Sequence, residues 1–248
     1  MTLEIINVSY SYKNSEKQKN DIISKLNFEI SIGEFVSIIG RSGTGKSTIL
    51  KLITGLLKQD EGEILLNNKA IKLGDVGYMP QRDLLLPWRT IMENIMISSE
   101  IQKERQMTKE EVREWLNRAG LIEYEDAYPK HLSGGMRQRV SFLRALLTGK
   151  ELLLLDEPFG ALDALTKKEM HAWLLSIWQE FKKTVLFITH DLEEACFLSD
   201  RILLLHPNKQ VEEIEVNLKR PRVLKMLHEK EIITLRQSLE KKITNEKI

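Results

Sequence analysis

The sequence predicts an α/β fold interrupted by a helical insertion. Apolar, strand-like runs alternate with helical segments in the first and last parts of the 248-residue chain. Between about residues 87 and 150, charged amphipathic helical patterns replace these runs. The length suits one large domain, or one domain that carries an inserted subdomain.

The first third of the chain is predicted to consist mainly of strands. They are expected at residues 3–10, 26–30, 34–40, 62–68 and 76–80. The run "EFVSIIG" is continuous and rich in β-branched residues, which is typical of a strand buried on both faces. The segment "GKSTILKLITGLL" follows it as a predicted helix, because Ile49, Ile53 and Leu57 recur at helical spacing.

Helices are predicted within the insertion, and strands return after it. The segment "KEEVREWLNRAG" is charged and amphipathic, and Val140, Leu143 and Leu147 mark a second helical face. Strand character returns in "LLLLD" and in "TVLFITH". Strands that alternate with helices indicate an α/β core around the insertion.

The chain is predicted to form one domain and a tail. The domain covers residues 1–220 and includes a helical subdomain at about 87–150. Residues 221–248 form a short helical C-terminal tail, in which Val223, Leu227 and Leu235 alternate with charged residues. The tail is too short to be a second domain.

Composition and charge exclude several classes. The formal net charge of +1 gives no electrostatic reason to expect a nucleic-acid partner. One cysteine, Cys196, excludes an internal disulfide framework and fits a reducing compartment; we expect it as a small buried residue on a helix. The N-terminus lacks a signal-peptide pattern, and no apolar run approaches the ~18–20 residues of a membrane span. Any membrane role is therefore expected through a partner.

The strongest motif is "GRSGTGKST" at residues 40–48, which matches G-x-x-x-x-G-K-[ST] between an apolar strand and a helix. Its residues are candidate nucleotide ligands: Gly40, Arg41, Ser42, Gly43, Thr44, Gly45, Lys46, Ser47 and Thr48. Glycines let successive backbone N–H groups face one anion, and the helix adds its positive N-terminal end. Lys46 can reach the β- and γ-phosphates, which makes it a catalytic candidate, and the Ser47 hydroxyl can bind Mg²⁺.

A second motif, "ELLLLDEP", supplies two acids at the end of a predicted buried strand. Asp156 can hold Mg²⁺, usually through water, and Glu157 is placed to polarise an attacking water molecule. Side chains of neighbouring strand residues point to opposite faces, so the chain must bend after Asp156 to bring both toward one ligand. With the phosphate loop, this pair predicts a nucleoside-triphosphate-binding domain. A small-molecule kinase, a GTPase, a helicase and a transport motor all remain open at this point.

The segment "LSGGMRQR" at residues 132–139 narrows the class. Here the chain resembles the ATP-binding subunits of ABC transporters, whose signature is usually LSGGQ. The resemblance runs from about residue 3 to 222 and includes four further matches in order. They are the stacking aromatic Tyr12, the Q-loop Gln81, the D-loop Asp163 and the switch His190.

The resemblance implies a RecA-like P-loop NTPase core with an antiparallel β subdomain and an inserted α-helical subdomain. It also implies ATP and Mg²⁺ as cofactors, with Ser47, Gln81 and Asp156 around the metal. Glu157 and His190 would act with Lys46 in catalysis. Tyr12 would stack on adenine, although Tyr10 competes for this role.

The family pairs two copies head to tail. Each ATP would lie between the phosphate loop of one copy and Ser133, Gly134 and Gly135 of the other, where a β-carbon would obstruct the phosphate. Asp163 would act across the same interface. The helical subdomain would carry the motion to transmembrane permease subunits, at the cytoplasmic face of the membrane.

Met136 departs from the usual glutamine of the signature. Met136, Val140, Leu143 and Leu147 share one helical face, so Met136 is predicted to begin a packing stripe. The phosphate donors are all present, and the substitution therefore does not threaten the ATPase interpretation.

Two segments, "QRDLLLPWRTIMENI" and "VEEIEVNLKRPR", resemble the nitrate/sulfonate/taurine-type importer branch, including its thiamine-precursor pyrimidine members. In that branch residues 86–88 face the membrane subunit; a buried loop tryptophan is the alternative for Trp88. An extracytoplasmic solute-binding protein would then be an indirect partner.

Three alternatives compete with a transport ATPase. A DNA-maintenance ATPase would place long coiled-coil arms between phosphate loop and signature and would favour a basic surface. A small-molecule kinase would not need the Ser-Gly-Gly turn or His190. A mechanical ATPase that acts on a membrane partner without solute transport remains open, and residues 86–88 argue modestly against it.

The other histidines have weaker cases. His131 is predicted to be structural, and the sequence identifies no partner for His171, His206 or His228.

Overall fold

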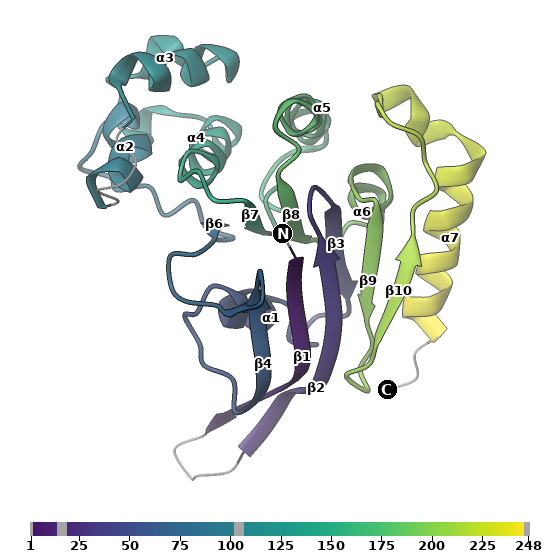
Figure 1. Cartoon of the computed structure of the whole chain (residues 1–248). Helices are drawn as coiled ribbons and strands as arrows, with labels where there is room; N and C mark the ends of the chain where they lie inside the picture. Colours follow the sequence, from purple (N-terminus) through teal and green to yellow (C-terminus); the bar gives the residue numbers. More distant parts are fainter. Residues whose placement is uncertain (1, 14–18, 102–106, 246–248) are drawn as a thin grey trace.

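The computed structural model describes residues 2–13, 19–101 and 107–245 and contains two β-sheets (Figure 1). The strands are β1 (Thr2–Lys13), β2 (Lys19–Ser31), β3 (Phe35–Gly40), β4 (Glu61–Leu66), β5 (Lys69–Ala70), β6 (Gly77–Met79), β7 (Leu152–Asp156), β8 (Thr184–Ile188), β9 (Arg201–Leu205) and β10 (Val211–Glu215). The helices are α1 (Lys46–Ile53), α2 (Ile91–Ile101), α3 (Lys109–Arg118), α4 (Gly134–Leu146), α5 (Ala164–Phe181), α6 (Leu192–Leu198) and α7 (Lys230–Asn245), with short 3₁₀ turns at Ile122–Tyr124, Pro129–His131 and Leu224–His228.

The central six-stranded sheet has the order β10-β9-β3-β8-β7-β6. All of its strand pairs are parallel except the antiparallel edge pair β10–β9. The smaller sheet, β2-β1-β4-β5, is antiparallel. This arrangement confirms the predicted α/β fold of a P-loop NTPase.

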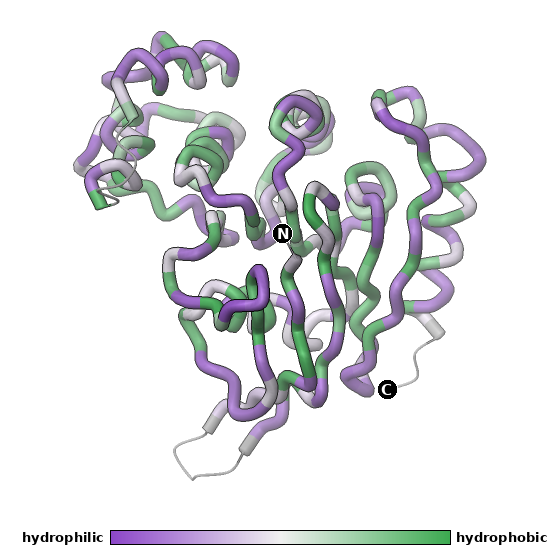
Figure 2. Tube along the Cα trace, in the orientation of Figure 1, coloured by the Kyte–Doolittle hydropathy of each residue, from purple (hydrophilic) through white to green (hydrophobic). Residues whose placement is uncertain are grey.

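Successive residues of the central strands pack alternately into two separate hydrophobic cores. In β7, Leu153 and Leu155 pack with the helical side of the molecule, whereas Leu152 and Leu154 pack with the antiparallel sheet and α1. The same alternation occurs in β3 and β8. A strand with apolar layers on both faces must be continuously apolar, which explains the run "LLLLD". Figure 2 shows this concentration of hydrophobic residues in the central strands, whereas hydrophobic and hydrophilic residues alternate along α7.

The helical insertion lies between β6 and β7. Figure 1 places α2, α3 and α4 together at one end of the molecule, far from α7 at the other. Thr108 begins α3 with a reciprocal capping box, in which its hydroxyl accepts the N–H of Glu111 and the Glu111 carboxylate accepts the N–H of Thr108. Residues 102–106 of the predicted helical block lie outside the described residues.

The predicted helix over residues 45–57 is too long. Helix α1 ends at Ile53, and Leu57 lies beyond it. Gly55 takes a left-handed conformation, with φ at 77°, which stops the helix where only glycine adopts that conformation readily. The repeat that includes Leu57 is therefore one turn longer than the helix itself.

Most of the described part of the C-terminal tail is helical. Residues 224–228 form a 3₁₀ turn, α7 follows, and residues 246–248 lie outside the described residues. Helix α7 packs against α6, and Arg236 of α7 lies 3.3 Å from Glu193 of α6. Cys196 is fully buried on α6, as predicted.

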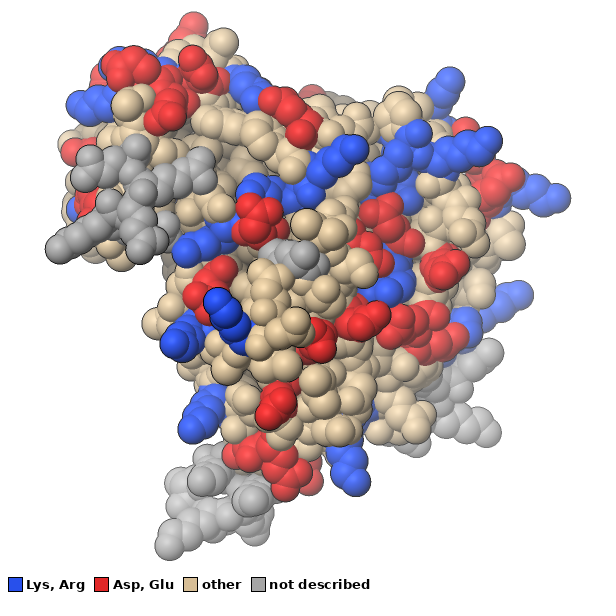
Figure 3. All heavy atoms as spheres, in the orientation of Figure 1, with Lys and Arg blue, Asp and Glu red and all other residues tan. Residues whose placement is uncertain are grey.

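No helix in the described part of the chain has the length and apolarity that a membrane crossing requires. On the face shown in Figure 3, acidic and basic side chains are interspersed, in keeping with the net charge near zero. The expectation of no nucleic-acid partner stays a prediction.

Candidate functional site

The phosphate loop lines a pocket of about 250 Å³ at the carboxyl end of β3. Its walls are Ile22, Ser42, Gly43, Gly45, Lys46, Ser47, Thr48 and Glu157. Gly45 has φ at 101°, and a β-carbon there would lie 2.8 Å from the Ile22 side chain. Glycine is therefore required both for the backbone conformation and for the close approach of β2. The close packing of β2 on Gly45 brings the Ile22 side chain into the pocket wall, and no sequence motif indicated that Ile22 lies there.

Lys46 lies across its own loop. Its ammonium donates hydrogen bonds to the carbonyl oxygens of Gly40 and Arg41, each at 2.9 Å. Burial lowers the pKa of Lys46 below its ordinary value, although the carboxylates of Glu157 and Asp156 oppose this shift. The ammonium is thus held at the loop by two neutral carbonyls, partners that an anionic phosphate can replace.

Asp156 is buried at the end of β7 and meets two hydroxyl groups. The Ser47 hydroxyl donates to its carboxylate at 3.2 Å, and the Tyr78 phenol also hydrogen-bonds to it. Burial raises the pKa of Asp156, while the hydrogen bond from Ser47 lowers it. Burial and the nearby Asp156 carboxylate raise the pKa of Tyr78 to about 12, so the phenol keeps its proton. Sequence reasoning missed Tyr78, which is on the neighbouring strand β6.

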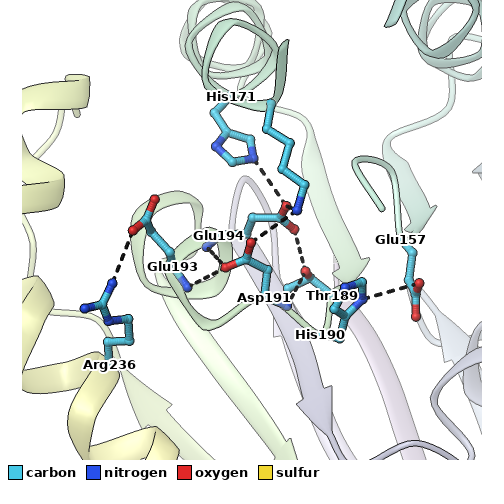
Figure 4. Close-up of polar contacts among 9 residues, drawn as sticks. Glu157, His171, Thr189, His190, Asp191, Glu193, Glu194 and Arg236 are labelled. Carbon is cyan, nitrogen blue, oxygen red and sulfur yellow. Dashed lines mark hydrogen bonds and ion pairs between the residues drawn. The ribbon is translucent and has the colours of Figure 1, made fainter. Parts of the chain in front are cut away.

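Glu157 makes the bend that the two-acid motif requires. Its φ is 47°, a left-handed conformation that is uncommon outside glycine, and its N–H donates to the carbonyl of Ile188 at 3.0 Å. The Gln81 amide donates to Glu157 Oε2 at 3.0 Å, and His190 Nδ1 lies 3.4 Å from the same oxygen. Figure 4 shows His190 facing Glu157. Gln81 and His190, predicted from separate motifs, therefore both contact the carboxylate of Glu157, which a third motif predicted.

The two signature glycines have different surroundings. Ser133 caps α4 and accepts the N–H of Met136 at 3.3 Å. A β-carbon at Gly135 would lie 2.7 Å from the Thr166 methyl, whereas at Gly134 it would meet nothing within 4 Å. The predicted reason for both glycines is thus incomplete: Gly135 is needed for packing of α4 on α5 within this chain, and only Gly134 faces open space.

Met136 is half-buried and packs against the core that contains Val140 and Leu143. This confirms that Met136 begins a packing stripe.

Asp163 caps helix α5. Its carboxylate accepts the N–H groups of Leu165 and Thr166, each at 3.1 Å, and the Thr166 hydroxyl at 2.6 Å. The hydroxyl and backbone N–H of Thr166 lower the pKa of Asp163. Neither Asp163 nor residues 133–135 belong to the described lining of the phosphate-loop pocket. One chain therefore does not bring these predicted residues to its own loop.

Tyr10 and Tyr12 of β1 differ in solvent exposure. Tyr12 is 37% exposed, whereas Tyr10 is half-buried and packs against the core beneath the hairpin. The rings meet edge to face with centroids 5.0 Å apart. Tyr12 thus offers more free ring surface to a base than Tyr10.

Two histidines gain partners that the sequence did not indicate. His171 Nε2 lies 3.6 Å from Glu194, and His206 Nε2 lies 3.2 Å from Glu212. The first contact joins α5 to α6, and the second joins the two sides of the turn between β9 and β10. Local sequence patterns do not indicate contacts of either kind.

The phosphate loop after β3 and the two acids at the end of β7 lie at the same carboxyl edge of the parallel sheet, an arrangement that defines a P-loop nucleoside-triphosphate-binding domain. The family model described as "ABC transporter" matches residues 23–160. The chain belongs to the ABC transporter family, and it is an ATP-binding subunit that hydrolyses ATP.

Relatives and solved structures agree with this family. The formylaminopyrimidine import ATP-binding protein ThiZ of Halalkalibacterium halodurans is 49% identical over 198 residues, covering 79% of this chain and 76% of the relative. The aliphatic sulfonates import ATP-binding protein SsuB of Bacillus cereus is 42% identical over 226 residues, covering 90% and 89%. The dimeric post-hydrolysis structure of the ATP-binding cassette MJ0796 with ADP and Pi matches with a TM-score of 0.77 at 32% identity, covering 88% of this chain and 100% of that one.

The contact between Gly135 and Thr166 yields a stability test. Gly135→Ala should lower the free energy of unfolding by about 1–3 kcal/mol, because its β-carbon overlaps the Thr166 methyl. Thr166→Ser removes that methyl but keeps the hydroxyl bonded to Asp163, so adding it to Gly135→Ala should restore most of the loss. Gly134→Ala is the matched control and should change stability by less than ~0.5 kcal/mol. Urea unfolding of Gly135→Ala, of its combination with Thr166→Ser and of Gly134→Ala, each beside the wild type, measures this; equal losses at both glycines would contradict the assignment.

Proposed function

We propose that this chain hydrolyses ATP to power import of a small solute through a membrane ABC transporter. The solute class is that of nitrate, sulfonates and taurine, or of pyrimidine precursors. The main observation in support of ATP hydrolysis is that Gln81 and His190 both contact Glu157, which lines the phosphate-loop pocket. The names of the formylaminopyrimidine and sulfonate relatives support the import function and the solute class.

In the proposed reaction the loop holds the ATP phosphates through its backbone N–H groups. Lys46 exchanges the carbonyls of Gly40 and Arg41 for the β- and γ-phosphates. Glu157 accepts a proton from the water that attacks the γ-phosphorus. His190 and Gln81 orient Glu157 and that water, because both side chains already converge on the Glu157 carboxylate.

The residues around Asp156 fit Mg²⁺. A buried carboxylate and a serine hydroxyl are hard oxygen ligands, which this ion prefers together with phosphate oxygens. Bound there with ATP, Mg²⁺ would neutralise phosphate charge. Ser47 and Asp156 would hold the ion, with the Gln81 amide oxygen as a further ligand. The phenol of Tyr78 would keep the Asp156 carboxylate oriented.

A second copy of the chain would complete each ATP site. Ser133 and Gly134 are exposed, and space is open above the Gly134 α-carbon, so a phosphate can approach the N-terminus of α4. The neighbouring exposed Asp163 would meet the partner at the same edge. The dimeric form of the similar ATP-binding cassette supports this pairing.

The segment at residues 86–88 suits a docking site for permease subunits. Trp88 is 70% exposed and Leu84 is 59% exposed, so a buried loop tryptophan is wrong for this position. The buried Asn94 holds the segment, since its side chain accepts the N–H of Leu86 at 2.7 Å and donates to the Leu86 carbonyl at 3.1 Å. Contact there would keep the protein peripheral, at the cytoplasmic face of the membrane. An extracytoplasmic solute-binding protein would deliver the solute on the other side.

Glu157→Gln separates binding from hydrolysis. The amide keeps the shape of the side chain but cannot accept the proton of the attacking water, so kcat should fall at least about 100-fold. ATP should still bind, and ATP should now trap a dimer. Steady-state phosphate release and size-exclusion chromatography with ATP measure the two effects. Lys46→Ala is the contrasting variant, because it should weaken ATP binding itself; normal turnover by Glu157→Gln would remove Glu157 as the base.

Solute uptake tests the transport function in cells. Loss of this chain should abolish energy-dependent uptake of either a labelled aliphatic sulfonate or a labelled formylaminopyrimidine. The wild-type chain should restore uptake and Glu157→Gln should not, because transport needs turnover. Unchanged uptake of every solute of these classes in cells without the chain would instead favour a mechanical ATPase without solute transport.

A further inference from the structure

A buried carboxylate lies one helical turn beyond His190. Glu194 on α6 is 3% exposed. The Thr189 hydroxyl donates a hydrogen bond to its Oε2, and Lys167 Nζ lies 3.1 Å from its Oε1. His171 Nε2 lies 3.6 Å from Oε1, and Figure 4 shows His171 and Thr189 approaching Glu194 from different elements.

These contacts fix the backbone on both sides of His190. The Thr189 hydroxyl, which donates to Glu194, also accepts the N–H of Asp191 at 3.0 Å. Asp191 in turn caps α6, accepting the N–H of Glu193 at 2.9 Å. The His190 side chain between them remains 60% exposed, 3.4 Å from Glu157. The backbone that carries His190 is therefore held on both sides by its two neighbours, while its own ring is largely exposed.

Lys167 joins this turn to another helix. It lies in the first turn of α5 and contacts both carboxylates, Glu194 at 3.1 Å and Asp191 at 3.2 Å. Burial lowers the pKa of Lys167, but Glu194 and Asp191 more than compensate and the net shift is upward. A buried carboxylate such as Glu194 depends strongly on a nearby cation, so this ion pair constrains where α6 and its preceding turn can lie.

The same turn of α5 borders the signature edge. Asp163 caps the helix four residues before Lys167, and Thr166 lies directly beneath Gly135. Because Asp163, Thr166 and Lys167 lie within one turn of the same helix, a shift of this edge would displace Lys167 as well. Contiguous contacts therefore run from the signature turn through Lys167 to the two neighbours of His190.

We propose that Lys167 is a positioning residue for ATP hydrolysis: from α5 it holds Asp191 and Glu194, and through them it aims His190 at Glu157 and the γ-phosphate. The inference rests on the proposed role of His190 in hydrolysis. It adds a route by which docking of a second copy at the signature edge reaches the catalytic pair of the same chain.

Steady-state ATPase kinetics of three variants test this inference. Lys167→Met should lower kcat roughly tenfold with the KM for ATP changed by less than about twofold, because the phosphate loop is untouched. Lys167→Arg keeps the charge and should restore kcat to within about threefold of wild type. Lys168→Met removes the adjacent exposed lysine and should leave both constants unchanged.

The His190→Ala background distinguishes positioning from general loss of structure. If Lys167 acts through His190, then Lys167→Met should lower kcat by less than about twofold further in that background. An equal fold-loss in both backgrounds, or a wild-type kcat for Lys167→Met, would overturn the inference. If His190→Ala itself leaves kcat unchanged, the proposed role of His190 is wrong and this inference falls with it. A reduced kcat for His190→Ala together with a wild-type kcat for Lys167→Met would refute this inference and leave the proposed role of His190 intact.

A charge-neutral variant covers the case in which Lys167→Met does not fold. The combination of Lys167→Met with Glu194→Gln removes both charges of the ion pair and keeps an acceptor for the Thr189 hydroxyl. Folded protein with about tenfold lower kcat would support positioning by Lys167. Wild-type kcat in this folded double variant would overturn it.

Discussion

The parallel pairing of β6, β7, β8 and β3 is the constraint on which the site depends. It brings the carboxyl ends of these strands to one edge of the sheet, where ligands bind in open α/β folds. In register, Asp156 of β7 lies beside Ile188 of β8, and Met79 of β6 lies beside Leu155. Residues a short step beyond each strand, such as Gln81 and His190, are therefore neighbours although they are far apart in sequence.

The left-handed turn at Glu157 converts this alignment into a catalytic arrangement. In a continuing strand, Asp156 and Glu157 would point to opposite faces of the sheet. The φ of 47° at Glu157 turns its carboxylate toward Gln81 and His190, while Asp156 stays with Ser47. Uncommon backbone conformations persist where surrounding contacts hold them, and they are concentrated at functional sites.

The local parts of this site could be predicted from the sequence, because each is coded in a short contiguous pattern. The phosphate loop, the two acids and the apolar strands are of this kind. The contacts that support them join distant residues, and composition or periodicity carries no trace of such pairings. Tyr78 reaches Asp156 from the next strand, and the Gln81 amide donates to Glu157 where the sequence indicated an oxygen facing a metal. Gly135 shows the same limit, since its need for glycine comes from a Thr166 methyl on another helix.

The helical core and the antiparallel core pack on opposite faces of the same central sheet. One chain carries a phosphate loop with its acids and, at a separate place, an exposed Ser133–Gly134 turn that touches nothing of that pocket in the described structure. The separation of these two places within one chain is the physical reason for the proposal that two copies share each ATP.

Mixing two inactive variants tests this shared site most directly. A Lys46→Ala chain lacks the phosphate-loop half and a Ser133→Arg chain lacks the signature half, so neither should hydrolyse ATP alone. A mixed dimer contains one complete site and one doubly defective site, and an equal mixture should recover up to about a quarter of the wild-type rate. An equal mixture that shows only the summed background of its two components would contradict a site shared between copies.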